Sequence, residues 1–405
     1  MRTDKGIHTS LRPVASEGKS PEMFLPGATI GILGGGQLGR MTAMAAKAMG
    51  YRVAVYDAMP DGPSFSCADL TVTAPFDDLD ALGRFASEVD VATVEFENIP
   101  VGALEFLETL IPVRPSARVV SVCQDRILEK EFLSGNGFPV APYRAVGSAE
   151  ELDAALRELD APAILKTAAL GYDGKGQASL CPGDDAVAAW AALGAPRAVL
   201  EKRVTFSSEA SVICARSPRG ETVCFPPQAN VHRGGILDVT TAPASLPGTA
   251  AREAQRITSS IAERLGAVGL ITAEFFVFPD GSLAVNELAP RPHNSGHHTL
   301  ETALTSQFAQ HLRAVCGLPL GPVGLRSPGA MVNLLGDLWA EGDPDWEVFL
   351  REPGCFLHLY GKQGAKPGRK MGHVTLLGDP EESAPRLLRM REQAAGHRQS
   401  PERQA

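Results

Sequence analysis

Two glutamates late in the chain, Glu274 and Glu287, are spaced as a pair of metal ligands would be. Between them lies Asp280–Gly281, a dipeptide that favours a two-residue hairpin loop. With that loop the two glutamates face each other across the strands, roughly 5 Å apart. Like charges placed there repel, and a divalent cation that also binds phosphate oxygens would remove the repulsion. The pair therefore predicts a magnesium–nucleotide site. The alternatives are a solvated hairpin, or a register slip of one residue that separates the glutamates.

A second group of residues has the composition of a phosphate-binding site. Lys166 ends the apolar run 163–165, and a glycine-rich loop that contains Lys175 spans residues 171–177. Glycines let the backbone fold closely over phosphates, and the lysines supply positive charge. The loop is not a Walker A loop because G-K-[ST] is absent, and an ordinary surface loop is the alternative. The strand expected at 198–202 leads to Glu209 and could follow adenine and ribose, or be an ordinary edge strand.

A third feature points to a different chemistry. The run 34–39 satisfies G-x-G-x-x-G between an expected strand and helix, and Asp57 ends the second strand about 20 residues later. That is the pattern of a dinucleotide site in an NAD-dependent dehydrogenase. The phosphate of another ligand would fit the same turn. A hydride-transfer enzyme has no need for the second phosphate apparatus, so the NAD interpretation is the weaker one.

The elements that must position these residues divide the chain into three folded regions. Short β-branched runs at 29–33, 52–56 and 91–96, with a helix at 38–49 between the first two, predict a parallel βαβ sheet. An amphipathic helix is expected around Ile257, Ile261 and Leu265. The expected domains are a disordered extension over 1–26, a Rossmann-like domain over 27–122, a mixed α+β domain over 123–317 with a lid at about 136–204 and a small β-containing domain over 318–378. A flexible tail or a loosely held helix is expected over 379–405. Met23, just before the first strand, is a candidate alternative start.

Composition excludes several classes of protein. The 405 residues exceed one ordinary core, and 44% hydrophobic with 21% charged residues is typical of a globular protein. A net charge of −9 without a long Lys/Arg run argues against general nucleic-acid binding. The seven cysteines form no C-x-x-C pair, which favours reduced thiols and a cytoplasmic location. No apolar run approaches the roughly 20 residues of a membrane helix.

Taken in order, the motifs resemble the ATP-grasp superfamily, and specifically its N5-carboxyaminoimidazole ribonucleotide synthetase family. The resemblance covers about 28–378. It is carried by residues 31–41 (GILGGGQLGRM), 93–100 (TVEFENIP), 171–177 (GYDGKGQ), 286–297 (NELAPRPHNSGH) and 368–373 (GRKMGH). The implied fold is an ATP-grasp fold with a Rossmann-like pre-ATP-grasp domain and a small C-terminal domain.

The resemblance also implies roles for individual residues. The implied metal ligands are Glu274 and Glu287. The implied ATP-binding residues are Arg126, Lys166, Gly171, Tyr172, Asp173, Gly174, Lys175, Gly176, Gln177, Glu201, Lys202, Arg203, Val204, Glu209, His232, Asn286 and Glu287. The implied substrate-binding residues are Gly36, Gln37, Leu38, Glu95, Glu97, Tyr172, Lys362, Arg369 and Lys370. The implied catalytic residues are Arg291, Asn294, Ser295, Glu97 and Asp173. His293 and His297 are either part of the site or structural histidines of the core.

The implied reaction joins ATP, bicarbonate and 5-aminoimidazole ribonucleotide, with Mg²⁺ (or Mn²⁺) as cofactor. Phosphorylation converts bicarbonate to carboxyphosphate, which releases CO₂ for capture by the substrate amine, and Glu95 or Glu97 takes up the amine's proton. The implied assembly is a homodimer, with functional coupling to the mutase that acts next. Other ATP-grasp ligases, such as a formate-dependent glycinamide ribonucleotide transformylase, remain alternatives, as do a dehydrogenase and a non-catalytic nucleotide sensor.

Overall fold

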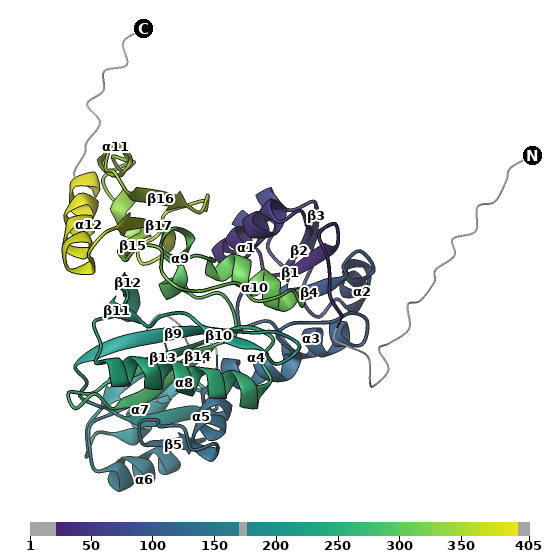
Figure 1. The fold of residues 1–405 in the computed structure, drawn as a ribbon. Helices are drawn as coiled ribbons and strands as arrows, with labels where there is room; N and C mark the ends of the chain where they lie inside the picture. Colours follow the sequence, from purple (N-terminus) through teal and green to yellow (C-terminus); the bar gives the residue numbers. More distant parts are fainter. Residues whose placement is uncertain (1–21, 170–175, 396–405) are drawn as a thin grey trace, which may run out of the picture.

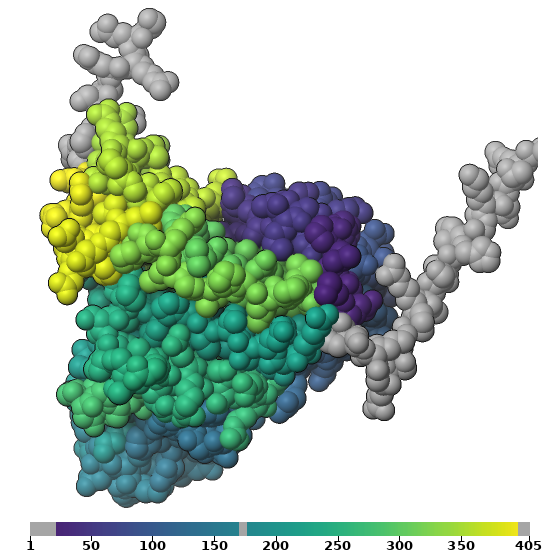
Figure 2. Space-filling view, in the orientation of Figure 1, coloured from purple at the N-terminus to yellow at the C-terminus, as the bar shows by residue number. Residues whose placement is uncertain are grey.

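The structure, a computed structural model, describes residues 22–169 and 176–395. Figure 1 shows three groups of elements around a long central sheet: the purple N-terminal part, the blue-green part at the bottom and the yellow C-terminal part. In the space-filling view of the same face, the N-terminal and C-terminal parts both rest on the green and teal middle of the molecule (Figure 2).

The N-terminal part is a parallel sheet with the strand order β3-β2-β1-β4. Side chains alternate between its faces: Ile30 and Ile32 pack in the core under α1 and α10, whereas Leu33 packs in the core under α2 and α3. The predicted βαβ sheet is therefore confirmed, with both faces covered. The elements are β1 (Thr29–Leu33), α1 (Gln37–Ala48), β2 (Arg52–Asp57), η1 (Pro63–Cys67), β3 (Leu70–Thr73), α2 (Leu79–Ser87), β4 (Val91–Val94), α3 (Val101–Glu108) and α4 (Ala117–Gln124).

The folded part of the chain begins earlier than expected. Residues 1–21 lie outside the described residues, but Phe24 falls within the expected extension and is buried in the core under α1. Its N–H donates to the carbonyl oxygen of Cys316 at 2.9 Å. An apolar ring that finds a core and a backbone partner holds this segment in place.

A smaller four-stranded sheet, β5-β8-β6-β7, contains most of the range expected to form the lid. All its pairs are antiparallel, and α6 and α7 supply the apolar side chains that cover it. The elements are β5 (Tyr143–Val146), α6 (Ala149–Leu159), β6 (Ala163–Thr167), β7 (Gln177–Leu180), α7 (Ala186–Leu193) and β8 (Ala198–Lys202).

The central sheet has nine strands, in the order β14-β13-β9-β11-β12-β15-β17-β16, with β10 paired to β9. It runs through the expected boundary at 317/318, since β12 pairs with β15. The predicted amphipathic helix is α8, whose Ile257, Ile261 and Leu265 are all buried against this sheet. The strands are β9 (Ser208–Arg216), β10 (Thr222–Cys224), β11 (Gln228–Arg233), β12 (Ile236–Ala242), β13 (Gly269–Val277), β14 (Leu283–Ala289), β15 (Gly329–Leu335), β16 (Cys355–Leu359) and β17 (Lys370–Leu377). The helices around it are α5 (Arg126–Gly135), α8 (Gly248–Leu265), η2 (Asn294–Gly296), α9 (Thr299–Thr302), α10 (Gln307–Val315), η3 (Gly336–Trp339), α11 (Glu347–Leu350) and α12 (Pro380–Ala395).

The segment from 379 onward, expected to be a loosely held helix or a flexible tail, is a packed helix for most of its length. Helix α12 packs Leu387, Met390 and Ala394 into the core of the C-terminal part. Arg391 on the same helix donates to Asp238 Oδ1 at 2.5 Å. The polar composition of this segment hid a narrow apolar stripe, which is enough to dock a helix. Residues 396–405 lie outside the described part of the chain.

Within the described ranges, no helix is long and apolar enough to cross a membrane.

Candidate active site

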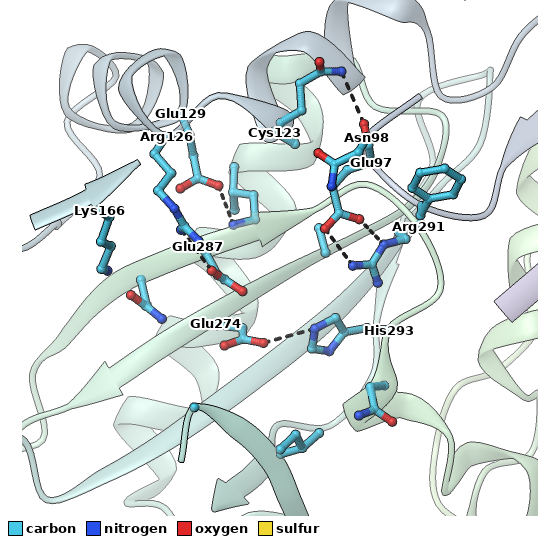
Figure 3. A pocket seen from close by; sticks show the side chains of 18 of the residues that line it. Glu97, Asn98, Cys123, Arg126, Glu129, Lys166, Glu274, Glu287, Arg291 and His293 are labelled. Carbon is cyan, nitrogen blue, oxygen red and sulfur yellow. Dashed lines mark hydrogen bonds and ion pairs between the residues drawn. The ribbon is translucent and has the colours of Figure 1, made fainter. Parts of the chain in front are cut away.

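A cavity of about 480 Å³ lies where the three parts meet. Gln37 and Glu95 reach it from the N-terminal part, Lys166 from the small sheet, Glu274 and Glu287 from the central sheet, and Lys370 from the start of β17. Figure 3 shows that Glu274 and Glu287 come from neighbouring strands, with Arg126 and Lys166 on the same side of the cavity. The residues are far apart in sequence, so tertiary packing alone assembles the cavity.

Glu274 lies directly opposite Glu287, as predicted, but the hairpin reaches this register by another route. The Phe278 N–H donates to Ser282 O and the Gly281 N–H to Phe278 O, both at 2.9 Å, so the loop has three residues. Gly281 adopts φ +82° at the loop's left-handed position. A two-residue loop would need an N–H at position 279, which is a proline. A β-bulge at Asn286 then shifts the register by one residue and restores the pairing of the glutamates.

Each carboxylate of this pair has one cationic or imidazole partner. Glu274 Oε1 lies 3.0 Å from His293 Nε2, and Glu287 Oε2 accepts from Arg126 Nη1 at 3.3 Å. Burial alone would raise the pKa of Glu287, but Arg126 and Lys166 outweigh it and lower the pKa below its usual range. Glu287 is therefore ionised at neutral pH.

The donors suit a hard cation that keeps several non-protein ligands. Among the described residues, no group of three or more His, Cys, Asp or Glu could hold a metal ion. Glu274 and Glu287 supply two adjacent carboxylates, and Asn286 lies beside them in the cavity wall. Magnesium is commonly held by one or two carboxylates together with water and substrate phosphates. The two glutamates fit that description and do not fit an all-protein cage.

Behind the carboxylates lies a buried ion-pair network. Lys166 Nζ is 3.1 Å from Glu201 Oε1, and Lys130 Nζ is 3.5 Å from Glu201 Oε2. Burial lowers the pKa of Lys166, and Glu201 opposes that effect. Glu201, which was expected along the adenine, thus uses its carboxylate to hold the lysine expected at the phosphates.

The segment that follows Glu201 is partly committed to the fold. The N–H groups of Lys202 and Arg203 donate to the carbonyl oxygens of Pro142 and Pro162, both at 2.8 Å. The described residues that line the cavity do not include Lys202, Arg203 and Val204. The N–H groups of Lys202 and Arg203 are therefore bonded within the protein, and the predicted contact of residues 201–204 with the adenine stays a prediction.

Glu209 and His232 are a further pair of residues that were predicted to bind the nucleotide. His232 Nδ1 lies 2.8 Å from Glu209 Oε2, and both residues line the cavity. Burial lowers the pKa of His232, but Glu209 outweighs burial and the net shift is upward. Phe206 and Phe276 stack beside them with ring centroids 4.6 Å apart. Sequence reasoning missed this aromatic pair, because the two rings come from a loop and a strand.

The opposite end of the cavity holds Glu95 and Glu97, the two candidates for contacting the aminoimidazole. Arg291 donates to Glu97 through both Nε and Nη2, the latter at 2.9 Å to Oε1. Burial alone would raise the pKa of Glu97, but Arg291 outweighs burial and lowers it to about 2. Burial raises the pKa of Glu95 to about 7. The hydrogen bond that Glu95 accepts from the Gly36 N–H opposes this effect but does not cancel it. The structure thus separates two carboxylates that the sequence left equivalent.

The glycine-rich turn at 34–39 uses its amides within the protein. Gly35 N donates to Asp57 Oδ2 and Gly36 N to Glu95 Oε2. A Cβ at Gly36 would overlap the Glu95 carboxylate, at 2.1 Å from its Oε1. The turn therefore orients Glu95, and Gln37 and Leu38 after it line the cavity. Asp57 does not stand free for a ribose, which removes the geometric basis of the dinucleotide interpretation.

The segment after Arg291 separates residues that the sequence had grouped. Asn294 lines the cavity, and both polar atoms of its side chain are buried without a hydrogen-bond partner. Ser295 is fully buried beneath it and bonds to Ser211 Oγ and His293 Nδ1, each at 2.8 Å. The role of Ser295 in orienting the bicarbonate-derived anion stays a prediction, and in the structure its hydroxyl bonds to Ser211 and His293. His297 is 1% exposed and accepts from Gln307, so it is the structural histidine of the two, whereas His293 lines the cavity.

The late basic group is also divided. Lys370 lines the cavity, whereas Arg369 donates to the backbone carbonyls of Gln363 and Gly364 in its own loop. Lys362 lies with its Nζ 5.7 Å from the ring centroid of Tyr360. The charge of Lys362 also acts to lower the pKa of Glu95. A shared phosphate site for the three basic residues stays a prediction.

The expected lid loop is only partly described. Gly171, Tyr172, Asp173, Gly174 and Lys175 lie outside the described residues, so their predicted contacts stay predictions. Gly176 adopts φ +69° and Gln177, at the start of β7, lines the cavity.

One cavity residue carried no signal in the sequence. Glu129 on α5 is 2% exposed, and its Oε2 accepts from Leu288 N at 2.7 Å. Burial raises the pKa of Glu129 to about 8. Only its position three residues after Arg126, on the same helix face, could have drawn attention to it.

Three families match consecutive parts of the chain. They are a ribonucleotide synthetase preATP-grasp domain over residues 27–124, an ATP-grasp domain over 131–308 and a phosphoribosylaminoimidazole carboxylase C-terminal domain over 329–386. Together they span all three sheets.

Known proteins are similar over nearly the whole chain. An N5-carboxyaminoimidazole ribonucleotide synthase of Bacillus subtilis is 44% identical over 365 residues, which is 90% of this chain and 95% of the relative. A crystal structure of the ADP complex of an N5-carboxyaminoimidazole ribonucleotide synthetase is 43% identical with a TM-score of 0.86, and covers 92% of this chain and 98% of that chain. An Aspergillus clavatus N5-carboxyaminoimidazole synthase, in complex with ADP and 5-aminoimidazole ribonucleotide, is 29% identical with a TM-score of 0.82, and covers 91% of this chain and 98% of that chain.

Proposed function

Because this chain belongs to the N5-carboxyaminoimidazole ribonucleotide synthase family, we propose that its cavity binds ATP at the Glu274–Glu287 end and the ribonucleotide at the Glu95 end. The protein is an ATP-dependent ligase with the ATP-grasp fold predicted from sequence. It forms N5-carboxyaminoimidazole ribonucleotide from 5-aminoimidazole ribonucleotide in purine biosynthesis.

The observation that carries the assignment of the two ends is the asymmetry of charge along the cavity. One end joins a carboxylate pair to Arg126 and Lys166, which suits a metal-bound polyphosphate. The other end places a buried carboxyl group, Glu95, behind a glycine turn, which suits a neutral amine.

Glu274 and Glu287 are the proposed magnesium ligands, with manganese as an alternative metal. When bound, the metal would neutralise the charge of the transferring phosphoryl group. Arg126 keeps Glu287 ionised, and His293 holds Glu274 on its Oε1 side. Both carboxylates are thereby oriented before the nucleotide arrives.

Glu95 is the proposed acceptor of the proton that the substrate amine releases. Its pKa of about 7 leaves it partly ionised at neutral pH, which suits a general base. Glu97 is a weak base because Arg291 is bound to it. We assign that pair to orienting the ribonucleotide rather than to proton transfer.

Bicarbonate is the proposed co-substrate, activated as carboxyphosphate, which releases CO₂ beside the amine. Asn294 supports this step, since it lines the cavity and both polar atoms of its side chain are buried without a hydrogen-bond partner, so they could orient a small anion. Exclusion of water from this buried site would limit loss of the intermediate.

A cytoplasmic location, a homodimer and coupling to the mutase acting next are further proposals. The seven cysteines are all unpaired, which supports a reducing compartment. The assembly and the coupling rest on the family alone.

The experiment that tests the function is ADP release from Mg-ATP, with and without 5-aminoimidazole ribonucleotide and bicarbonate. We expect turnover only when both are present. Glycinamide ribonucleotide with formate is the control, and turnover with that pair alone would keep the fold and overturn the substrate.

A further inference from the structure

The strand that carries Glu287 lies at the edge of the central sheet. β14 is the first strand in the sheet order, so only one of its sides pairs with a strand, β13. An edge strand leaves backbone N–H and C=O groups on its outer side that need other partners. On this outer side Val285 N donates to Pro139 O at 2.7 Å, and the next two groups, Asn286 O and Leu288 N, bond to α5. Asn286 and Leu288 flank Glu287 in sequence.

Two buried polar side chains of α5, Lys130 and Glu129, satisfy the Asn286 carbonyl and the Leu288 N–H. Lys130 Nζ donates to Asn286 O at 2.7 Å, and Glu129 Oε2 accepts from Leu288 N at 2.7 Å. Lys130 is 1% exposed and Glu129 2% exposed, so neither exchanges these bonds for water. The pair bonds to the strand edge as a neighbouring strand would.

The position of these bonds coincides with the β-bulge. The register shift falls at Asn286, and it is this extra residue that brings Glu287 opposite Glu274. Without the bulge, Glu287 would pair one residue further along β13, where alternate side chains point to the other face. Bulges are local departures from regular pairing, so bonds on both sides of this one stabilise it against the regular register.

The helix adds a third contact from the same face. Arg126, Glu129 and Lys130 stand at i, i+3 and i+4, and Arg126 donates to the Glu287 carboxylate itself. Figure 3 shows Arg126 and Glu129 descending side by side from this helix toward Glu287. Lys130 Nζ also lies 3.5 Å from Glu201 Oε2 on β8. Because Glu201 is also the ion-pair partner of Lys166, this contact connects the bulge to Lys166.

We propose that Glu129 and Lys130 are positioning residues that hold the β14 bulge, and thereby keep the Glu287 carboxylate beside that of Glu274. The proposal rests on the proposed role of these two glutamates as magnesium ligands. Glu129 and Lys130 act through the backbone of Asn286 and Leu288 and need no contact with the nucleotide.

The test compares three substitutions on α5. Glu129→Met removes the acceptor at similar length, Glu129→Gln keeps an oxygen that can accept from Leu288 N, and Glu131→Met is the matched control on the exposed face. The first measurement is hydrogen exchange at the Leu288 amide in the metal-free protein. The second is binding of ADP by calorimetry, in excess Mg²⁺ and separately in EDTA.

We expect Glu129→Met to raise Leu288 exchange at least about tenfold and to weaken Mg-ADP binding about tenfold, as loss of a residue that orients a metal ligand does. ADP binding in EDTA should change less than about twofold, and Glu129→Gln and Glu131→Met should resemble the parent protein. Unchanged exchange at Leu288, or equal loss of ADP binding with and without magnesium, would overturn the proposal. Glu129 would then be only a structural anchor of α5.

If Glu129→Met does not fold, Glu129→Asp replaces it. Aspartate keeps the carboxyl group and withdraws the acceptor by one carbon–carbon bond, about 1.5 Å, so the same two changes should follow. Absence of both in folded Glu129→Asp, with Glu129→Gln unchanged, would also overturn the proposal. Failure of the metal assignment is distinguishable, because ADP binding by the parent protein would then be independent of magnesium while Leu288 exchange still reported the bulge.

Discussion

The two ends of the cavity treat buried charge in opposite ways. At the proposed nucleotide end, each predicted acidic residue that the structure describes has a cationic or imidazole partner from another element. The pairs are Glu287–Arg126, Glu201–Lys166, Glu209–His232 and Glu274–His293. At the proposed ribonucleotide end Glu97 is paired with Arg291. Glu95 accepts from a backbone N–H, and burial is the largest influence on its pKa.

This difference separates two kinds of catalysis. Paired, ionised groups hold their geometry and act on charge that is already present, which suits phosphoryl transfer. A carboxyl group whose pKa lies near neutral pH can gain and lose a proton, which suits acceptance of the amine proton. In the proposed function, one end of the cavity therefore balances the charge of the nucleotide and metal, and the other end accepts the proton.

The largest expected effect comes from breaking the balanced end. Glu287→Gln removes a proposed metal ligand and leaves Arg126 without its carboxylate, so we expect turnover to fall about 10³-fold. Steady-state ADP release across a magnesium titration measures this. Glu131→Gln, on the exposed side of α5, is the matched control, and near-normal turnover of Glu287→Gln would remove it from the metal site.

A smaller effect is expected from neutralising the other end. Glu95→Gln keeps an acceptor for Gly36 N but cannot take up a proton, so kcat should fall about 10²-fold while Mg-ADP affinity stays unchanged. Glu97→Gln should instead raise the KM for the ribonucleotide, because it releases Arg291. Equal losses of kcat in the two variants would contradict the assignment of the proton acceptor.

The pH dependence of kcat sharpens the same distinction. Glu95 accepts a proton only when ionised, so kcat should rise about tenfold from pH 6 to pH 8, with a midpoint near its pKa of about 7. Glu97, with a pKa of about 2, contributes no change in this window. The pH–rate profile of Glu95→Gln should lose this limb, and a retained limb would show that another group carries it.

The smallest effect concerns the basic residues near the ribonucleotide end. Lys370 lines the cavity, so Lys370→Ala should raise the KM for the ribonucleotide about fivefold, which is about 1 kcal/mol. Arg369→Ala should change the KM less than about twofold, because Arg369 is bonded to its own loop. The reverse order would mean that this loop rearranges when the substrate binds.

Prediction from sequence succeeded where local patterns decide the outcome. The parallel sheet followed from β-branched runs around a helix, and α8 followed from Ile257, Ile261 and Leu265 at four-residue spacing. The facing of Glu274 and Glu287 was predicted correctly, although the assumed two-residue loop was wrong. Pro279 excluded that loop, and the bulge at Asn286 compensated for the extra loop residue.

The sequence could not predict a side chain's partner where that partner comes from a distant element. Ser295 and Arg369 carry the right chemistry for the site, but Ser211 and the 363–364 backbone occupy them. Glu95 and Glu97 are two residues apart and have the same side chain. Their pKa values differ because Arg291, from a distant part of the chain, is bonded to Glu97. Glu129 could not be found at all, because its role depends on the edge of β14.

The sequence by itself determined the family, the order of the elements and the residue types that the reaction needs, since short-range periodicity and motif spacing are written in the chain. The tertiary structure alone decided which of those residues are ionised, which face the cavity and which serve the fold. The physical reason is that burial, ion pairing and hydrogen bonding depend on neighbours brought together by packing, and such neighbours can lie far apart in sequence, as Glu97 and Arg291 do at 194 positions.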